Sequence, residues 1–192
     1  VVVVMKRAPR RATPRPGPTL FRCRLDDRTP AEQEARRGER GGTATPALTL
    51  DLAQHLQRGP AIVRLEATDA GGQVLSTNTY WQAKDDAGYR AMNDMAPVSL
   101  NTSVATRVEG DETIAALTLT NQTPTPAIEA KLTMMNQNGE QVLPAFFTDN
   151  YVSLLPGETR TIEVRYPTAK AERAGITLRG WNVAKARVEL GQ

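Results

Sequence analysis

The chain of 192 residues has room for one large domain or two small ones, but not for a complete (β/α)₈ barrel enzyme. Hydrophobic residues make up 40% of it and charged residues 23%, which is ordinary globular usage and argues against disorder of the whole chain. The formal net charge is +3, the single cysteine cannot form an internal disulfide, and no apolar run approaches the roughly 20 residues that cross a bilayer. We therefore expect a soluble chain with no membrane partner and no visible signal peptide, in a compartment that the sequence leaves open.

The positive charge belongs to the N-terminal segment. Residues 1–42 hold eleven basic and five acidic side chains, five prolines and four glycines. They show no sustained period of 2 or 3.6, so we expect residues 1–44 to be a basic, largely flexible segment. Three interpretations stay open: a solvated linker, a basic tail that binds an anionic polymer, or translation outside the natural reading frame of a GC-rich gene.

A β-hairpin is predicted after this segment. Ala61–Thr68 alternates between its two faces with the period of 2 that is typical of a half-buried strand, and Val74–Trp81 follows as its partner. The turn between them contains two glycines, which tolerate the positive φ of a tight connection. We expect residues 45–82 to be the terminal strands of a preceding β-sandwich domain. If residues 1–44 are not a real domain, this hairpin has lost most of its parent sheet. A lone hairpin is marginally stable in water, so it should then pack on the following domain or be partly mobile.

An all-β architecture is predicted for the rest of the chain. Residues 83–96 are expected to be a connector with one short helical turn, because Tyr89, Met92 and Met95 recur every three residues. Seven short strands separated by turn signals follow in residues 97–192: Val98–Val108, Thr113–Thr120, Ile128–Met135, Gln141–Phe147, Thr159–Tyr166, Ile176–Trp181 and Val183–Leu190. The predicted fold is an immunoglobulin-like β-sandwich preceded by a partial second β-sandwich and the flexible basic segment.

Few residues carry chemistry. His55 is the only histidine, and we interpret it as a surface or partly satisfied side chain rather than a triad member or metal ligand. The adjacent acids Asp26–Asp27, Asp85–Asp86 and Asp111–Glu112 lie on predicted loops, where solvated turn residues are favoured over a glycosidase pair. No catalytic residue, metal site or cofactor is predicted. Two glycosylation patterns of the kind expected by chance begin at Asn101 and Asn121.

Aromatic side chains offer the one candidate ligand surface. Phe146, Phe147, Tyr151 and Trp181 could stack on sugar rings if they were exposed on one face, as in a carbohydrate-binding module. The favoured interpretation is that Trp81 and Trp181 fill the cores of two β domains, because large aromatic side chains dominate core packing.

Three segments together resemble a known family. They are LSTNTYW at residues 75–81, FTDNYVSLLPGETRTI at residues 147–162 and LRGWNV at residues 178–183. Their order and spacing resemble the C-terminal β-sandwich region of family 2 glycoside hydrolases, in the exo-β-D-glucosaminidase and β-mannosidase branch. The residues that match the family pattern, and that we expect to serve the fold, are Asn78, Tyr80, Trp81, Asp149, Asn150, Tyr151, Pro156, Gly157, Glu158, Gly180, Trp181 and Asn182.

The resemblance implies a retaining glycosidase whose catalytic glutamates lie in a barrel that this chain lacks. The implied role is a non-catalytic accessory domain whose partners are the remaining domains of the parent enzyme and, as a second partner, a polysaccharide. Nucleic acid is not expected to bind. Whether the parent removes terminal glucosamine or mannose stays open, and binding of sugars or of an anionic polymer are the alternative functions. Two features depart from the family pattern: the connector is short, and residues 1–44 do not resemble the preceding family domain.

Overall fold

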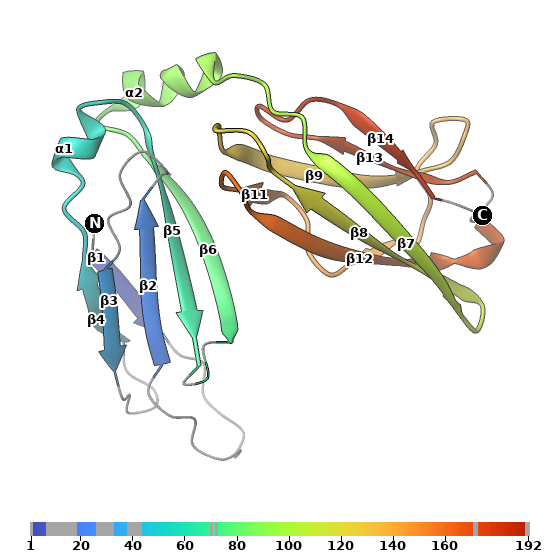
Figure 1. The fold of residues 1–192 in the computed structure, drawn as a ribbon, viewed down its shortest axis with the longest axis horizontal. Helices are drawn as coiled ribbons and strands as arrows, with labels where there is room; N and C mark the ends of the chain where they lie inside the picture. Colours follow the sequence, from blue (N-terminus) through green and yellow to red (C-terminus); the bar gives the residue numbers. More distant parts are fainter. Residues whose placement is uncertain are drawn as a thin grey trace. The chain divides into compact units, whose positions relative to one another are not determined.

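A computed structural model describes residues 2–6, 19–25, 33–37, 44–69, 71, 73–170 and 173–190 (Figure 1). The chain divides into two compact units, Val1–Asp94 and Met95–Gln192. Each described unit is built mainly from antiparallel strands, which confirms the all-β prediction.

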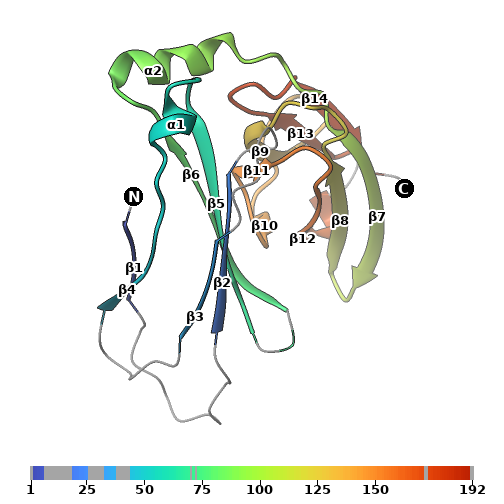
Figure 2. The ribbon, with the colours of Figure 1, turned by 60° about the vertical axis from the view of Figure 1, so that its left-hand side comes forward.

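The first unit contains two sheets. Its strands are β1 (Val2–Lys6), β2 (Thr19–Leu25), β3 (Gln33–Arg37), β4 (Ala44–Thr49), β5 (Ala61–Thr68) and β6 (Val74–Gln82). β1 pairs with β4, and the other four strands form a sheet in the order β3-β2-β5-β6 (Figure 2). The predicted hairpin is therefore present as β5 and β6, with Ile62 opposite Trp81.

The N-terminal segment contains more regular structure than expected. β2 runs antiparallel to β5, so the hairpin is half of a four-stranded sheet and the condition under which it would stand alone is not met. Within the segment expected to be largely flexible, the structure places the strands β1, β2 and β3. Sequence reasoning weighed the scarcity of apolar side chains, but strand pairing is carried by backbone hydrogen bonds that any residue can make. The expectation of flexibility elsewhere in residues 1–44 lies outside the described residues.

Short helices precede and follow the hairpin in the sequence. α1 (Ala53–Leu56) precedes β5, and α2 (Asp86–Arg90) continues into a 3₁₀ turn, η1 (Ala91–Asp94). The side chain of Asp85 accepts a hydrogen bond from the amide of Gly88 at 2.9 Å, which caps α2. The helical turn predicted in the connector is therefore present.

The second unit is a sandwich of two four-stranded sheets (Figure 1). One sheet has the order β10-β12-β8-β7, from β7 (Asn101–Glu109), β8 (Glu112–Thr120), β10 (Phe146–Phe147) and β12 (Thr159–Pro167). The other has the order β11-β9-β13-β14, from β9 (Ala127–Met135), β11 (Val152–Leu154), β13 (Gly175–Arg179) and β14 (Ala186–Glu189). A short 3₁₀ turn, η2 (Thr168–Lys170), follows β12.

The core of the sandwich lies between these sheets. Leu117 and Ile162 from one sheet and Leu132 and Ile176 from the other are each at most 2% exposed. Apolar side chains alternate with half-exposed ones along β8, β9 and β12, which places one face of each strand in the core. Burial also raises the pKa of Tyr166, partly offset by its hydrogen bond with Thr113.

β7, β13 and β14 depart from their predicted ranges by two or three residues at one end, and two further strands differ more. The strand expected over Gln141–Phe147 is reduced to β10 and one isolated bridge between Gln141 and Met135. β11 was not predicted, because it is three residues long and all three are buried, so it shows no alternation. Its pairing with β9 completes the second sheet and places the preceding loop at the edge of that sheet.

Candidate functional site

The Pro156-Gly157-Glu158 turn serves the fold. Gly157 has φ +78°, a conformation that side chains with a Cβ rarely adopt, and its amide donates to the carbonyl of Asn121 at 2.7 Å. The carboxylate of Glu158 accepts from the amide of Leu155 at 2.8 Å. Glu158 thus closes the turn that leads into β12.

Asn121 is a structural residue that the sequence analysis missed. Its side chain is fully buried, and its amide donates to the carbonyls of Thr125 and Leu154 at 2.9 and 3.1 Å. The glycosylation pattern that begins at Asn121 is therefore inaccessible in the folded chain. The other pattern begins at Asn101, which is exposed and donates to the side chain of Gln122 at 2.7 Å.

The Asp149-Asn150-Tyr151 loop extends the second sheet through a side chain. The Oδ1 atom of Asn150 accepts from the amide of Leu132 at 2.8 Å, and its Nδ2 donates to the carbonyl of the same residue at 3.0 Å. Asn150 thus replaces a strand residue beside β9. Asp149 pairs with Arg160 at 2.9 Å, and Tyr151 follows with φ +54°.

Gly180 is required by close contact with the backbone. A Cβ at this position would lie 2.6 Å from the carbonyl oxygen of Ile128 and 2.9 Å from that of Glu129, distances that real Cβ atoms do not show. The next residue, Trp181, donates its amide to the carbonyl of Ile128 at 2.9 Å, yet its side chain is 58% exposed. The interpretation of Trp181 as a core residue was therefore wrong.

Asn182 fastens three backbone segments together. Its Oδ1 atom accepts from the amide of Ile128 at 2.9 Å, while its Nδ2 donates to the carbonyls of Pro126 and Ala96 at 2.8 and 3.2 Å. Its own carbonyl accepts from the amide of Val98 at 2.7 Å. Because Asn182 is 8% exposed, each of these bonds satisfies a polar group that has little access to water.

The first family segment lies on β6. Trp81 is half-buried opposite Ile62, and Tyr80 is 47% exposed opposite Val63. Asn78, also exposed, faces Leu65 across the hairpin. This segment lies on an edge strand of the sheet. A structural role for Asn78, Tyr80 and Trp81 stays a prediction.

The four predicted sugar contacts do not form one row. Phe146 and Phe147 lie on β10 in one sheet, whereas Tyr151 and Trp181 adjoin strands of the other. Phe147 packs against the core, and Phe146 is 64% exposed. Tyr151, 52% exposed, has the ammonium of Lys131 at 5.4 Å from its ring centroid. Sugar contact by these residues stays a prediction.

Two acids of the described pairs serve local structure. Asp85 caps α2, and Glu112 forms an ion pair with Arg165 at 2.9 Å. Asp26–Asp27 lies outside the described residues. His55 lies in α1, and the described part of the chain holds no cluster of three or more potential metal ligands.

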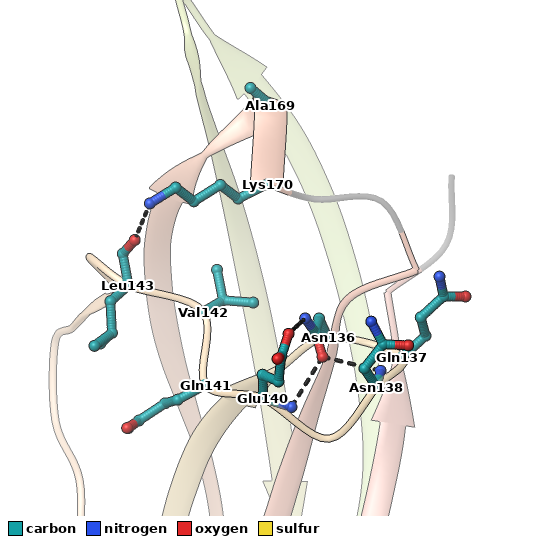
Figure 3. A pocket seen from close by; sticks show the side chains of 9 residues that line it. All are labelled: Asn136, Gln137, Asn138, Glu140, Gln141, Val142, Leu143, Ala169 and Lys170. Carbon is teal, nitrogen blue, oxygen red and sulfur yellow. Dashed lines mark hydrogen bonds between the residues drawn. The ribbon is translucent and has the colours of Figure 1, made fainter.

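A polar depression of about 480 Å³ lies beside the loop of residues 136–143 (Figure 3). The Nδ2 of Asn136 donates to the carboxylate of Glu140 at 2.8 Å, and its Oδ1 accepts from the amides of Asn138 and Glu140. The ammonium of Lys170 donates to the carbonyl of Leu143. These polar groups bond to one another and stabilise the loop. We therefore interpret the depression as a consequence of how the turn folds.

The outer surface of the β10-β12-β8-β7 sheet, which we call the ion-paired face, balances its charges internally. Arg107 pairs with Glu109 and Glu163 at 2.9 and 2.8 Å, and Arg165 pairs with Glu112 and Glu109 at 2.9 and 3.5 Å. The hydrogen bond from Arg107 lowers the pKa of Glu109, and the acidic partners raise the pKa of both arginines. Because these groups are exposed, the network contributes little to stability.

The fold and these anchors define an immunoglobulin-like sandwich whose family-pattern residues in the second unit mainly hold backbone in place. Comparison with known families identifies residues 78–183 as an exo-β-D-glucosaminidase Ig-fold domain. The chain belongs to this family, which confirms its resemblance to the C-terminal region of family 2 glycoside hydrolases. Within the described residues, no helix has the length and apolar character needed to span a membrane.

Relatives with this domain are several times longer than the chain. The exo-β-D-glucosaminidase of Streptomyces avermitilis is 29% identical over 170 residues, which cover 77% of this chain and 19% of the relative. That of Hypocrea virens is 31% identical over 152 residues, 68% of this chain and 17% of the relative. The chain thus spans about a fifth of the length of the relatives it matches. A mannosylglycoprotein endo-β-mannosidase of Lilium longiflorum matches over only 45 residues, at 38% identity.

Solved structures share the fold. The exo-chitosanase CsxA of Amycolatopsis orientalis superposes with a TM-score of 0.78 and 23% identity, over 90% of this chain and 24% of that one. Coverage of 90% reaches into residues 1–44, because the residues after that segment make up a smaller share of the chain. The fold likeness therefore includes part of a segment that the sequence analysis set apart from the family.

Proposed function

We propose that this chain is a non-catalytic accessory region of a retaining family 2 glycoside hydrolase whose whole polypeptide removes terminal β-linked glucosamine. One observation carries the proposal: the polar family-pattern side chains of the sandwich form hydrogen bonds with the backbone. The carboxylate of Glu158, for example, closes a turn, and Asn150 and Asn182 bind main-chain groups of neighbouring strands. Groups held in this way maintain a scaffold and are not poised for acid–base chemistry.

Glucosamine is favoured over mannose as the sugar removed by the parent. The matches that extend over most of this chain are named exo-β-D-glucosaminidases, whereas the mannosidase match is confined to 23% of it. The role of the region is then to pack against the other domains of the parent and to stabilise them. The distribution of the exposed aromatic side chains over two sheets gives the carbohydrate-binding alternative little support, because sugar platforms need coplanar rings.

An assay of the full 192-residue chain tests this proposal. The chain is incubated with p-nitrophenyl-β-D-glucosamine and with chitosan oligosaccharides, and both hydrolysis and binding are measured, the latter by isothermal titration calorimetry. We expect neither hydrolysis nor binding. Hydrolysis by the chain alone would contradict the non-catalytic role. Binding that Trp181→Ala abolishes, with the fold intact, would instead establish a carbohydrate-binding module.

A further inference from the structure

A row of basic side chains crosses the outer surface of the β11-β9-β13-β14 sheet. Lys131 on β9 lies directly opposite Arg179 on β13. Lys185 comes next along this row, because it immediately precedes Ala186, the partner of Leu178 on β14. All three residues line one open pocket of about 470 Å³ on this surface, together with Thr133 and Thr177.

The three cations lack a neutralising partner in the part of the chain that the structure describes. None of them has a carboxylate within 4.0 Å. Glu189, at the other end of β14, is paired with Arg187 at 2.6 Å. Neighbouring strands lie about 4.8 Å apart, so like charges face one another across the sheet, an arrangement that is unfavourable unless an anion joins it.

Exposed aromatic rings adjoin the same row. Tyr151 lies beside Lys131, with its ring 52% exposed, and Trp181 follows Arg179 by two residues and is 58% exposed. Trp, Tyr and Arg are the residue types that most often dominate the energy of protein–protein interfaces. We call these five residues, Tyr151, Lys131, Arg179, Lys185 and Trp181, the cationic face.

The positive charge of this face favours an anionic partner over a cationic one. An amino sugar such as glucosamine carries a cation when its amine is protonated, so a chitosan chain would be repelled by three unpaired basic groups. A surface rich in Asp and Glu would neutralise them. Because the chain spans about a fifth of the length of its relatives, most of the polypeptide of such an enzyme is available to supply that surface.

We propose that the cationic face docks onto an acidic protein surface of the remaining polypeptide of the parent enzyme, an inference that rests on the accessory function proposed above. Lys131, Arg179 and Lys185 would form charge-assisted hydrogen bonds with carboxylates, while Tyr151 and Trp181 supply apolar contact area. Desolvation of the row on docking would strengthen these ion pairs relative to those of the ion-paired face, which stay in water.

Poly-L-glutamate serves as the acidic probe in a test on the full 192-residue chain. ¹H–¹⁵N correlation spectra, recorded during a titration at low salt, report binding residue by residue. We expect shifts at the five residues of the cationic face, reversed by 0.5 M NaCl because salt screens exposed charges. Lys131→Glu combined with Arg179→Glu and Lys185→Glu should weaken binding at this face at least tenfold.

A matched variant controls for net charge. Arg58, Lys84 and Arg90 are exposed residues of the first unit, so their joint substitution by Glu changes the charge equally and should leave shifts at the cationic face in place. Equal losses in both variants, or shifts confined to the N-terminal arginines, would overturn the proposal. Dispersed spectra of each variant show that it is folded, and the triple substitution by Gln provides a milder version of the same test.

The identity of the acidic partner is tested with two further probes. Oligogalacturonate carries carboxylates on sugars, and tighter binding of it than of poly-L-glutamate at the cationic face would overturn the assignment to a protein partner. Binding of chitosan oligosaccharides there would overturn the charge argument. The hydrolysis assay tests the non-catalytic role, and these titrations test the docking surface. Because the two experiments are independent, either proposal can be contradicted without the other.

Discussion

The two outer faces of the sandwich use charge in opposite ways. On the ion-paired face, Arg107 and Arg165 are each placed between two acidic side chains, and threonines such as Thr118 and Thr161 pair across the strands at 2.9 Å. On the cationic face, no carboxylate of the described residues pairs with Lys131, Arg179 or Lys185. The charges of the first face are neutralised within the domain, whereas those of the second would be neutralised by an anionic partner. The difference indicates which side of the domain is built to meet another surface.

The largest loss of stability is expected at Gly180, which follows β13 in the sheet that carries the cationic face. Gly180→Ala forces a Cβ against two backbone carbonyls, so we expect the free energy of unfolding to fall by about 3 kcal/mol. Gly110→Ala is the control, because no atom lies within 4 Å of its Cβ and only its φ of +65° is strained, at a cost of about 1 kcal/mol. Urea unfolding measures both, and equal losses would show that close contact at Gly180 is unimportant.

A smaller loss is expected for the side chain that extends β9. Asn150→Ala removes two hydrogen bonds to the backbone of Leu132 and should cost about 2 kcal/mol. Thr161→Ala, on the ion-paired face, removes one exposed hydroxyl pair and should cost about 0.5 kcal/mol. Thermal unfolding ranks the two variants. The reverse order would mean that the loop before β11 is not part of the sheet.

Removing one arginine from each face should change the melting temperature in different ways. Arg107→Gln removes two ion pairs and should lower the melting temperature at low salt. Arg179→Gln removes a repelled cation and should leave that temperature unchanged or raise it. Both effects should shrink in 1 M NaCl, because salt screens exposed charges. A lower melting temperature for Arg179→Gln would contradict the assignment of an unneutralised row.

The smallest effect is the acid sensitivity of the ion-paired face. The hydrogen bond from Arg107 holds the pKa of Glu109 below its ordinary value of about 4.5. This carboxylate therefore stabilises the fold above that value, and its contribution disappears as the pH falls through the lowered pKa. Glu109→Gln should flatten the loss of stability as the pH falls below about 5, measured by urea unfolding. Lys185→Gln, the control, should keep the slope of the unsubstituted chain.

Sequence reasoning located the strands that show strong alternation and failed where alternation is absent. β8, β9 and β12 agree with prediction to within one residue at each end, because each presents one face to the core. β11 is buried throughout, and β2 is built by backbone pairing with β5. The first arrangement leaves no period in the sequence, and the alternation of Phe21, Cys23 and Leu25 with arginines in β2 spans only five residues.

The site was harder to predict than the fold. Gly180 and Asn182 must both face inward, which leaves Trp181 outside, but this follows only once their backbone contacts are known. Alternation indicates that Lys131 and Arg179 point away from the core. That they lie opposite each other depends on β13 pairing with β9, a pairing of strands about 45 residues apart that no local pattern records.

The most direct test of the accessory function is an exchange of domains. The region of the Amycolatopsis orientalis exo-chitosanase that superposes on this chain is replaced by the chain itself, and hydrolysis of p-nitrophenyl-β-D-glucosamine is compared with that of the intact and truncated enzymes. We predict that the chimera retains most of the activity that truncation abolishes, and that Gly180→Ala in the chimera lowers its melting temperature. A chimera no more active than the truncated enzyme would contradict the accessory function.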